Sequence, residues 1–191
     1  MYLLYDSILS SLVLTPDLKF LTSLVTPRIS SGGQNDHDIL LELCSDKYKM
    51  HRVLDSNVAA NLKYLGILDF LPRLTSQTEL KRGILKAQSR VQFVPWATKL
   101  VFVVLSGEPD PKFAGVQVSN NTLIAQVLAR IVKQYDLLAK REAYVNYYTS
   151  DNSAESRAAV METFREAKDT VVSTIDEYKE CQLESYLDDE L

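Results

Sequence analysis

The first residues that could do chemistry in this chain are the two histidines, His37 and His51. A histidine acts as a general base, or activates a nucleophile, when a carboxylate, serine or cysteine is held against its ring. Neither histidine has such a neighbour at a spacing that indicates catalysis. We therefore assign no catalytic residue to the chain.

The cysteines do not predict a metal site. Cys44 and Cys181 are far apart in the sequence and have no companion cysteine, so their spacing supports neither a zinc site nor a disulfide framework. Two isolated cysteines fit a protein of a reducing, intracellular compartment. We expect no metal and no bound cofactor in this chain.

A nucleotide site is the next possibility, and Gly32-Gly33 is the only glycine pair. A phosphate cradle needs several glycines in a tight turn, so that backbone N–H groups reach the anion. This pair has no lysine after it and lies in a polar stretch, 28–36, which favours a mobile connection. The sequence therefore predicts a loop here rather than a GTP site.

Charge and hydropathy limit the partners. The net charge is −4, but residues 151–191 hold 12 acids and 4 bases, which leaves the first 150 residues net positive. The longest apolar run, Leu100 to Leu105, is far shorter than the roughly 20 residues of a membrane span. The best basic stripe on one predicted helix is Arg130, Lys133, Lys140 and Arg141. Four bases on a long helix favour a solvated face, so we expect no nucleic acid and no membrane, and a protein partner with acidic patches stays open.

The first half of the chain alternates helical and strand patterns. Apolar spacing predicts a helix over 2–13, and Thr15-Pro16-Asp17 ends it. A strand is predicted over 18–25, and a short helix over 37–46 follows the loop. The next strand, 58–71, contains Gly66, which indicates a bulge.

Further elements complete an α+β layer. Ser76-Gln77-Thr78-Glu79 has the spacing of a capping box, which predicts a helix over 77–89. Two strands are expected over 90–94 and 99–105, separated by Pro95-Trp96. The fold class is therefore α+β.

The last third reads as two long helices. The pattern changes at 119–122, where Asn120-Asn121-Thr122 matches a glycosylation acceptor but is better explained as a helix N-cap. Apolar stripes predict helices over 123–147 and 154–181 that pack antiparallel, with Phe164 and Ile175 buried between them. The acidic end, 186–191, is expected to fray.

A family resemblance adds to this reading. The segment Lys133 to Tyr144, preceded by Ser119-Asn120-Asn121-Thr122-Leu123-Ile124, resembles the beginning and body of the long C-terminal helix of gamma-tubulin. Other matches keep the family's order and extend over nearly the whole chain: Leu12 to Leu21, Thr26-Pro27, Phe93 to Trp96 and Ile175 to Tyr178. Pro95 before Trp96, and Tyr148 to Asp151 between the last helices, favour gamma- over alpha- and beta-tubulin. The end Ser185 to Asp189 is similar to budding-yeast-type gamma-tubulins.

The resemblance implies a domain organisation. Residues 1–118 correspond to the family's intermediate domain, a two-layer sandwich of a mixed sheet with helices, entered inside its first helix. Residues 119–191 correspond to the C-terminal domain, an antiparallel helical hairpin with an acidic tail. The N-terminal GTPase domain has no counterpart in these residues, so GTP is expected only with that domain. The chain is interpreted as a fragment, a truncated gene model or a short paralogue.

The resemblance also implies partners and places. Gamma-tubulin is a structural template for microtubule nucleation at the spindle pole body or microtubule-organising centre, in the cytoplasm and cytoskeleton. It binds gamma-tubulin complex proteins, alpha/beta-tubulin and lateral gamma-tubulin copies. We expect the complex proteins near Lys81, Lys86 and Arg90, and lateral contacts at the loop made of Arg28, Ile29, Ser30, Ser31, Gly32 and Gly33.

Two other functions stay open at this point. Alpha-tubulin has a catalytic glutamate in the early helix, and Ser7 stands at that position here, with Asp6 beside it. Serine cannot supply the carboxylate, so hydrolysis is not supported by these residues. The other alternative is a generic cytosolic adaptor whose two C-terminal helices bind partners.

Overall fold

The fold is built on one mixed sheet. The computed structural model describes residues 2–28, 34–45, 47, 61–72, 75–105, 107, 112–149, 151 and 153–190. The sheet has five strands in the order β1-β5-β2-β3, and β4 also pairs with β2. The β1–β5 and β5–β2 pairs are antiparallel, whereas β2 is parallel to β3 and β4. The strands are β1 (Leu21–Pro27), β2 (Lys63–Leu71), β3 (Gln92–Phe93), β4 (Val101–Leu105) and β5 (Phe113–Asn121). The α+β prediction is thus confirmed.

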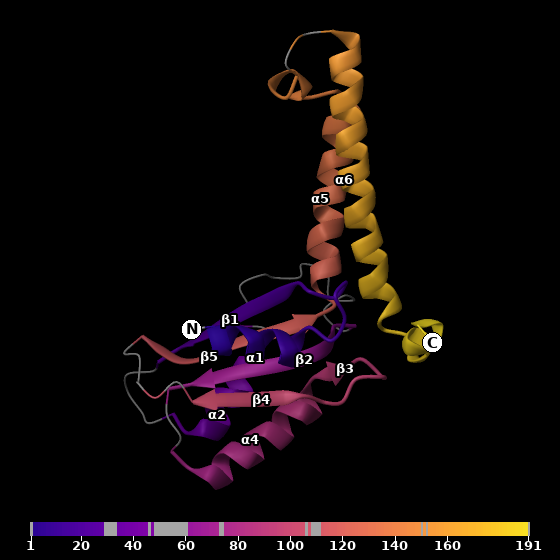
Figure 1. The fold of residues 1–191 in the computed structure, drawn as a ribbon. Coiled ribbons are helices and arrows are strands. Elements are labelled where there is room, and N and C mark those ends of the chain that lie inside the picture. The colour runs from indigo at the N-terminus through magenta and orange to yellow at the C-terminus, as the bar shows by residue number, and fades with distance from the viewer. Residues whose placement is uncertain are drawn as a thin grey trace.

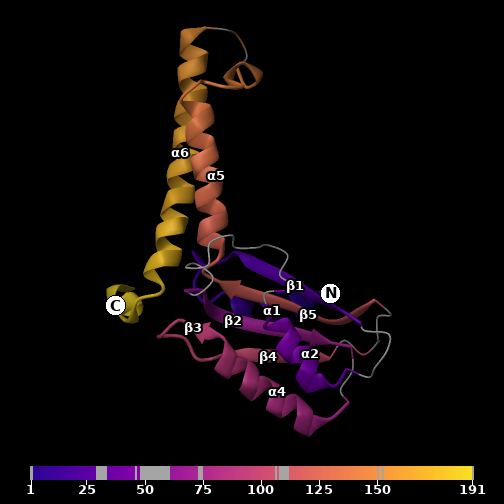
Figure 2. The same ribbon diagram turned by 180° about the vertical axis from the view of Figure 1, so that it is seen from behind.

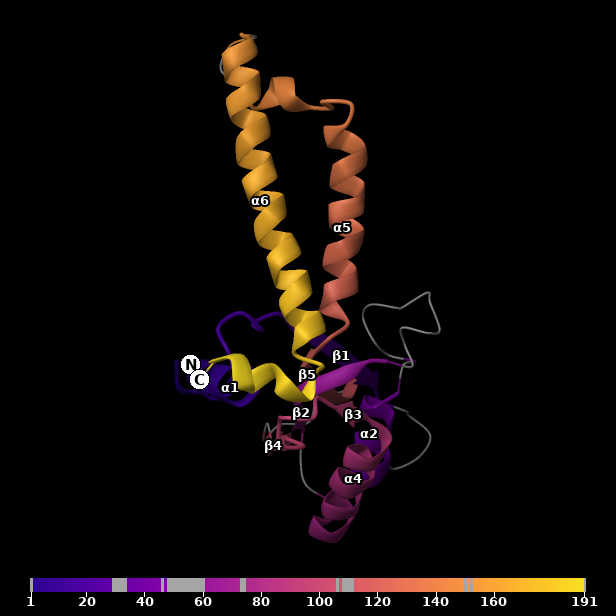
Figure 3. The same ribbon diagram turned by 90° about the vertical axis from the view of Figure 1, so that its right-hand side faces the viewer.

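Helices cover both faces of the sheet. Seen edge-on, α1 (Tyr2–Leu12) lies on one face, and α2 (Asp36–Leu43) and α4 (Gln77–Arg90) lie on the other (Figure 3). Two glycines permit close packing. A Cβ on Gly66 would lie 3.2 Å from the Ser11 carbonyl oxygen, and one on Gly83 would lie 2.7 Å from Leu40 Cδ1. The strand therefore approaches α1, and α4 approaches α2, more closely than a larger residue allows.

The bulge predicted at Gly66 is confirmed. Tyr64 is opposite Asn121 and Gly66 is opposite Asn120, so Leu65 has no partner on β5. An extra residue of this kind bends its strand and redirects its side chain. Leu65 is fully buried in the cluster under the two long helices.

The capping box predicted at Ser76 is half right. The Ser76 hydroxyl accepts the Glu79 N–H at 3.4 Å, but the Glu79 carboxylate pairs with Arg82 instead of the Ser76 N–H. That N–H donates to Asp36 Oδ2 at 2.8 Å, and the Thr75 N–H donates to the same oxygen at 2.9 Å. A carboxylate on α2 thus caps α4.

Strand β5 was not predicted, and the N-cap assigned to the asparagines is wrong. Asn120 and Asn121 lie in the strand and are buried, because neighbouring elements satisfy their amides. Asn121 Nδ2 donates to Thr22 Oγ1 at 2.6 Å, and Asn121 Oδ1 accepts the Leu123 N–H at 3.1 Å. The cap residue itself is Leu123, which makes no side-chain cap bond.

Two long helices rise from one end of the sheet (Figure 1): α5 (Ile124–Ala139) and α6 (Ala154–Glu180). The predicted start of α6 is confirmed, but α5 ends eight residues before Tyr147. Glu142 and Tyr144 have left-handed φ values of 47° and 65°, and the Ala143 N–H closes the helix on the Leu138 carbonyl at 3.0 Å. A single 3-10 turn, Val145–Tyr147, follows.

The burial expected between the long helices is right for one residue and wrong for the other. Ile175 is 5% exposed, whereas Phe164 is only half-buried. Phe164 packs edge-on against Tyr148 at 5.1 Å and lines an apolar groove of about 240 Å³ with Ile131 and Tyr135. Figure 3 shows the reason, because the helices diverge away from the sheet.

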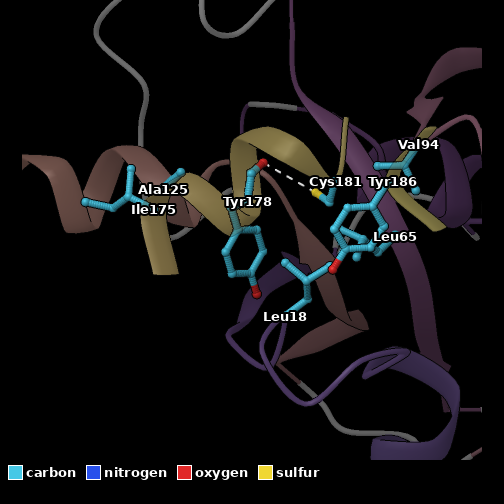
Figure 4. Close-up of a cluster of buried hydrophobic side chains, with 8 residues drawn as sticks. All are labelled: Leu18, Leu65, Val94, Ala125, Ile175, Tyr178, Cys181 and Tyr186. Carbon is cyan, nitrogen blue, oxygen red and sulfur yellow. Dashed lines mark hydrogen bonds between the residues drawn. The ribbon is translucent and has the colours of Figure 1, made fainter. Parts of the chain in front are cut away.

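The main core lies where α5 and α6 meet the sheet. We call it the root cluster, and Figure 4 shows its members. They are Leu18, Leu65, Val94, Ala125, Ile175, Tyr178, Cys181 and Tyr186. A second cluster lies between the sheet and α2: Leu24, Ile39, Leu40, Leu43, Leu71 and Ala114.

The C-terminal segment folds onto this core, so the expectation that all of it frays is wrong. The 3-10 helix η3 (Glu184–Glu190) places Tyr186 against Trp96, with ring centroids 5.0 Å apart, and the Tyr186 hydroxyl bonds Glu177. Trp96 Nε1 donates to the Cys181 carbonyl at 2.6 Å. An aromatic pair and its hydrogen bonds therefore hold the end of the chain.

Candidate interaction surface

The residues considered for chemistry do not assemble into a catalytic site in the described parts of the chain. His37 Nδ1 lies 3.0 Å from Asp38 Oδ1 at the surface, a contact that sequence spacing did not identify, and His51 is outside the described residues. Burial raises the pKa of the Cys181 thiol to about 12, so it stays protonated and unreactive. Asp6 is exposed on α1, and the Ser7 side chain is outside the description.

The described residues form neither a metal centre nor a membrane span. They contain no group of three or more His, Cys, Asp and Glu side chains placed to hold a metal ion. Within the same ranges, the helices lack the length and apolar character that crossing a membrane requires. The remaining candidates are surfaces that bind other molecules.

Helix α4 carries the first such surface. The three predicted interface residues, Lys81, Lys86 and Arg90, are all exposed on it. Its inward stripe consists of Leu80, Gly83, Ile84 and Ala87, which are buried or pack against the cluster between α2 and the sheet. Figure 2 shows α4 alongside α2 on that side of the sheet. All three bases are therefore accessible at the surface of α4, and their role in a partner interface stays a prediction.

An apolar residue lies among these charges. Leu85 is 68% exposed, outside the inward stripe. Together with Arg82, Lys86, Ser89 and His37 it lines an open hollow of about 410 Å³ between α2 and α4. An exposed leucine surrounded by cations resembles the centre of a protein interface, where an apolar contact is ringed by charges. The sequence analysis did not identify Leu85. Its position off the apolar stripe of the predicted helix is the sequence signal that could have indicated an exposed leucine.

The charge of this surface is positive. Glu79 is the only acid on α4, and it is paired with Arg82 at 3.0 Å. Lys81, Lys86 and Arg90 form no ion pair with a described residue, so their charges are available to a partner. We call Lys81, Leu85, Lys86 and Arg90 the α4 surface.

The predicted lateral loop can be placed at one end only. Arg28 is exposed after β1, and its N–H donates to the Lys112 carbonyl at 2.9 Å. Ile29, Ser30, Ser31, Gly32 and Gly33 lie outside the described residues. The lateral role of this loop stays a prediction.

Known proteins place the chain in a family. No protein-family model matches it. The tubulin gamma chain of Candida albicans is 43% identical over 198 residues, covering 100% of this chain and 38% of the relative. The gamma chain of Eremothecium gossypii is 30% identical over 206 residues, again covering the whole chain and 42% of the relative. The chain belongs to the gamma-tubulin family.

The match has a limited span. The tubulin gamma chain of Saccharomyces cerevisiae is 24% identical over 208 residues, covering 43% of its length. The chain thus spans about two fifths of the length of these gamma-tubulin relatives. The resemblance inferred from the motifs is confirmed, and the mixed sheet with flanking helices is compatible with it.

Proposed function

We propose that this chain is the C-terminal half of a gamma-tubulin and, within the whole protein, forms part of the template that nucleates microtubules. The observation that carries the proposal is the 43% identity to a gamma-tubulin over the full chain. Nucleation is slow because the first subunits lose translational and rotational freedom before enough contacts form. A preassembled ring raises the effective concentration of neighbouring sites and removes much of that cost.

In this proposal the chain has two parts. Residues 1–118 form the intermediate domain, and 119–191 form the C-terminal domain, with α5 and α6 as its antiparallel hairpin. The nucleotide-binding domain lies in the rest of the protein, and GTP binds to that domain. The site of action is the microtubule-organising centre, or spindle pole body, of the cytoplasmic cytoskeleton.

In this proposal each surface of the chain contacts a different partner. The α4 surface receives a gamma-tubulin complex protein, because its free cations surround an exposed leucine. Lateral gamma-tubulin copies contact the loop from Arg28 to Gly33, and alpha/beta-tubulin adds to the assembled template. These contacts are non-covalent and act by holding the subunits in position, so they need no covalent chemistry in this chain.

The α4 surface can be tested by charge reversal in full-length gamma-tubulin. Replacing Lys81, Lys86 and Arg90 by Glu should lower capture by gamma-tubulin complex proteins about ten-fold at low salt, because rim charges govern encounter and salt sensitivity. Capture is measured by surface plasmon resonance at two salt concentrations. The matched control is K19E/K112E/R165E, which makes the same net charge change at exposed positions away from α4. Equal losses in both variants would remove the α4 surface from the interface.

The absence of a nucleotide site in these residues is also testable. The 191-residue chain alone should bind no GTP, because its sequence supplies no glycine-rich cluster of backbone donors for a triphosphate. Labelled GTP is titrated against the chain, with full-length gamma-tubulin as the positive control. Saturable binding to the chain at micromolar concentration would contradict this.

A further inference from the structure

Helix α5 presents a second basic surface that the proposed function does not use. Arg130, Lys133, Leu137 and Lys140 recur at helical spacing, and Arg141 follows in the turn. All five residues are exposed. The α6 side of the same helix consists of other residues: Leu128, Val132 and Tyr135 contact α6, and Asp136 pairs with Lys168. We call the five the outer α5 face, because the helical repeat turns them away from α6.

The charges of the outer α5 face are uncompensated. None of its four cations forms an ion pair with a residue that the structure describes. The nearby acids are already engaged, since Asp136 holds Lys168 at 2.7 Å and Glu142 holds Arg157 at 2.6 Å. This leaves a row of positive charge about three turns long with no acid of its own.

An apolar residue lies in the middle of that row. Leu137 is 63% exposed, with Lys133 one turn before it and Arg141 one turn after. Exposed leucine surrounded by unpaired cations favours a partner that brings both negative charge and an apolar side chain. A nucleic acid brings negative charge through its phosphates but no aliphatic side chain to place on Leu137.

We propose that the outer α5 face binds a short acidic peptide segment of a partner protein, which seats one apolar side chain on Leu137. The segment's carboxylates pair with Lys133, Lys140 and the two arginines. Arginine adds bidentate geometry to these contacts. This inference does not rest on the nucleation function, because it uses a different helix and a different face.

The test uses the 191-residue chain and a fluorescent peptide, Asp-Glu-Leu-Asp-Asp-Tyr-Glu-Asp, in an anisotropy titration. The chain is expected to bind the peptide in the micromolar range, with affinity falling at least ~5-fold between about 20 and about 300 mM salt as the charges are screened. K133E/K140E should weaken binding at least ~10-fold, because it removes two attractive pairs and adds two repulsive ones. L137A should weaken binding about 3-fold without changing the salt dependence.

Three controls distinguish the proposal from general basic attraction. K19E/K99E makes the same net charge change at exposed positions away from α5 and should leave the affinity within about 2-fold. The neutral peptide Asn-Gln-Leu-Asn-Asn-Tyr-Gln-Asn should not bind, and circular dichroism checks that each variant is folded. Equal losses in K133E/K140E and K19E/K99E would overturn the proposal. Tighter binding of an oligothymidylate than of the acidic peptide, or equal binding of the neutral peptide, would do so as well.

Discussion

Replacing Tyr178 by alanine is expected to lower the free energy of unfolding by about 4 kcal/mol. Tyr178 is fully buried in the root cluster, and its hydroxyl joins three elements. It accepts the Phe20 N–H at 3.0 Å and donates to Asn120 Oδ1 at 3.2 Å. The alanine leaves a cavity where α6 meets the sheet, and it leaves the buried Asn120 Oδ1 and the part-buried Phe20 N–H without the hydroxyl that bonds them. Urea melts of the 191-residue chain measure the change.

Tyr178→Phe separates the contribution of the buried ring from that of the hydroxyl hydrogen bonds. Phenylalanine keeps the ring and deletes the hydroxyl, so it should cost about 1–2 kcal/mol, the usual penalty for leaving a buried polar group such as Asn120 Oδ1 unpaired. Burial raises the pKa of the Tyr178 hydroxyl to about 12, so the phenol is protonated throughout the measurable range and these losses should not vary with pH. A loss below about 1 kcal/mol for the alanine variant would show that the root cluster does not hold α6 to the sheet.

The second large effect is a gain in stability, expected from Asp69→Asn above pH 7. Asp69 is fully buried on β2, and its Oδ1 accepts Gln117 Nε2 at 2.9 Å. The other oxygen, Oδ2, has no hydrogen-bond partner among the described residues. Burial raises the pKa of this carboxyl from 3.8 to about 7, against the smaller opposing effect of the Gln117 hydrogen bond.

A raised folded-state pKa fixes the direction of the pH effect. The folded chain holds a proton that the unfolded chain releases near pH 4, so stability is full below the unfolded pKa and falls as pH rises to 7. The loss is on the order of 3 to 4 kcal/mol. Asparagine keeps the acceptor for Gln117 without the charge.

The Asp69→Asn variant should therefore equal the parent at pH 4 and exceed it at pH 8 by an amount of that order. Denaturant melts at the two pH values measure it. Asp6→Asn removes the same charge from an exposed position and should change stability little at either pH. A variant that is no more stable than the parent at pH 8 would show that Asp69 is not charged inside the fold.

The elements that the sequence predicted well are those with local signals. The spacing of apolar residues placed α6, and Ser76 placed the beginning of α4 within one residue. Strand β5 was missed because its inward positions are polar, including Gln117, Ser119 and Asn121. Their partners, such as Asp69 and Thr22, are distant in sequence, so no local pattern shows that they are buried.

Predictions about surfaces depended on another signal. The cations of α4 were chosen because the gamma-tubulin resemblance places this helix at the interface with complex proteins, whereas Leu85, an apolar residue off the inward stripe, was overlooked. The extent of α5 was overestimated because helix-forming residues continue to Tyr147, and the left-handed turn at Glu142 and Tyr144 has no glycine to mark it. Family likeness identified the chain through short motifs that periodicity could not interpret.

The way α6 is held has a mechanical consequence. Its buried residues, Ile175 and Tyr178, lie in its last two turns, and the rest of the helix extends away from the sheet. A helix of 27 residues is about 40 Å long, so a tilt of about 5° at its base displaces the far end by roughly 3.5 Å. Helix α6 therefore acts as a lever arm, in which a small repacking around Tyr178 becomes a displacement of several ångströms at Ala154, the far end of the helix.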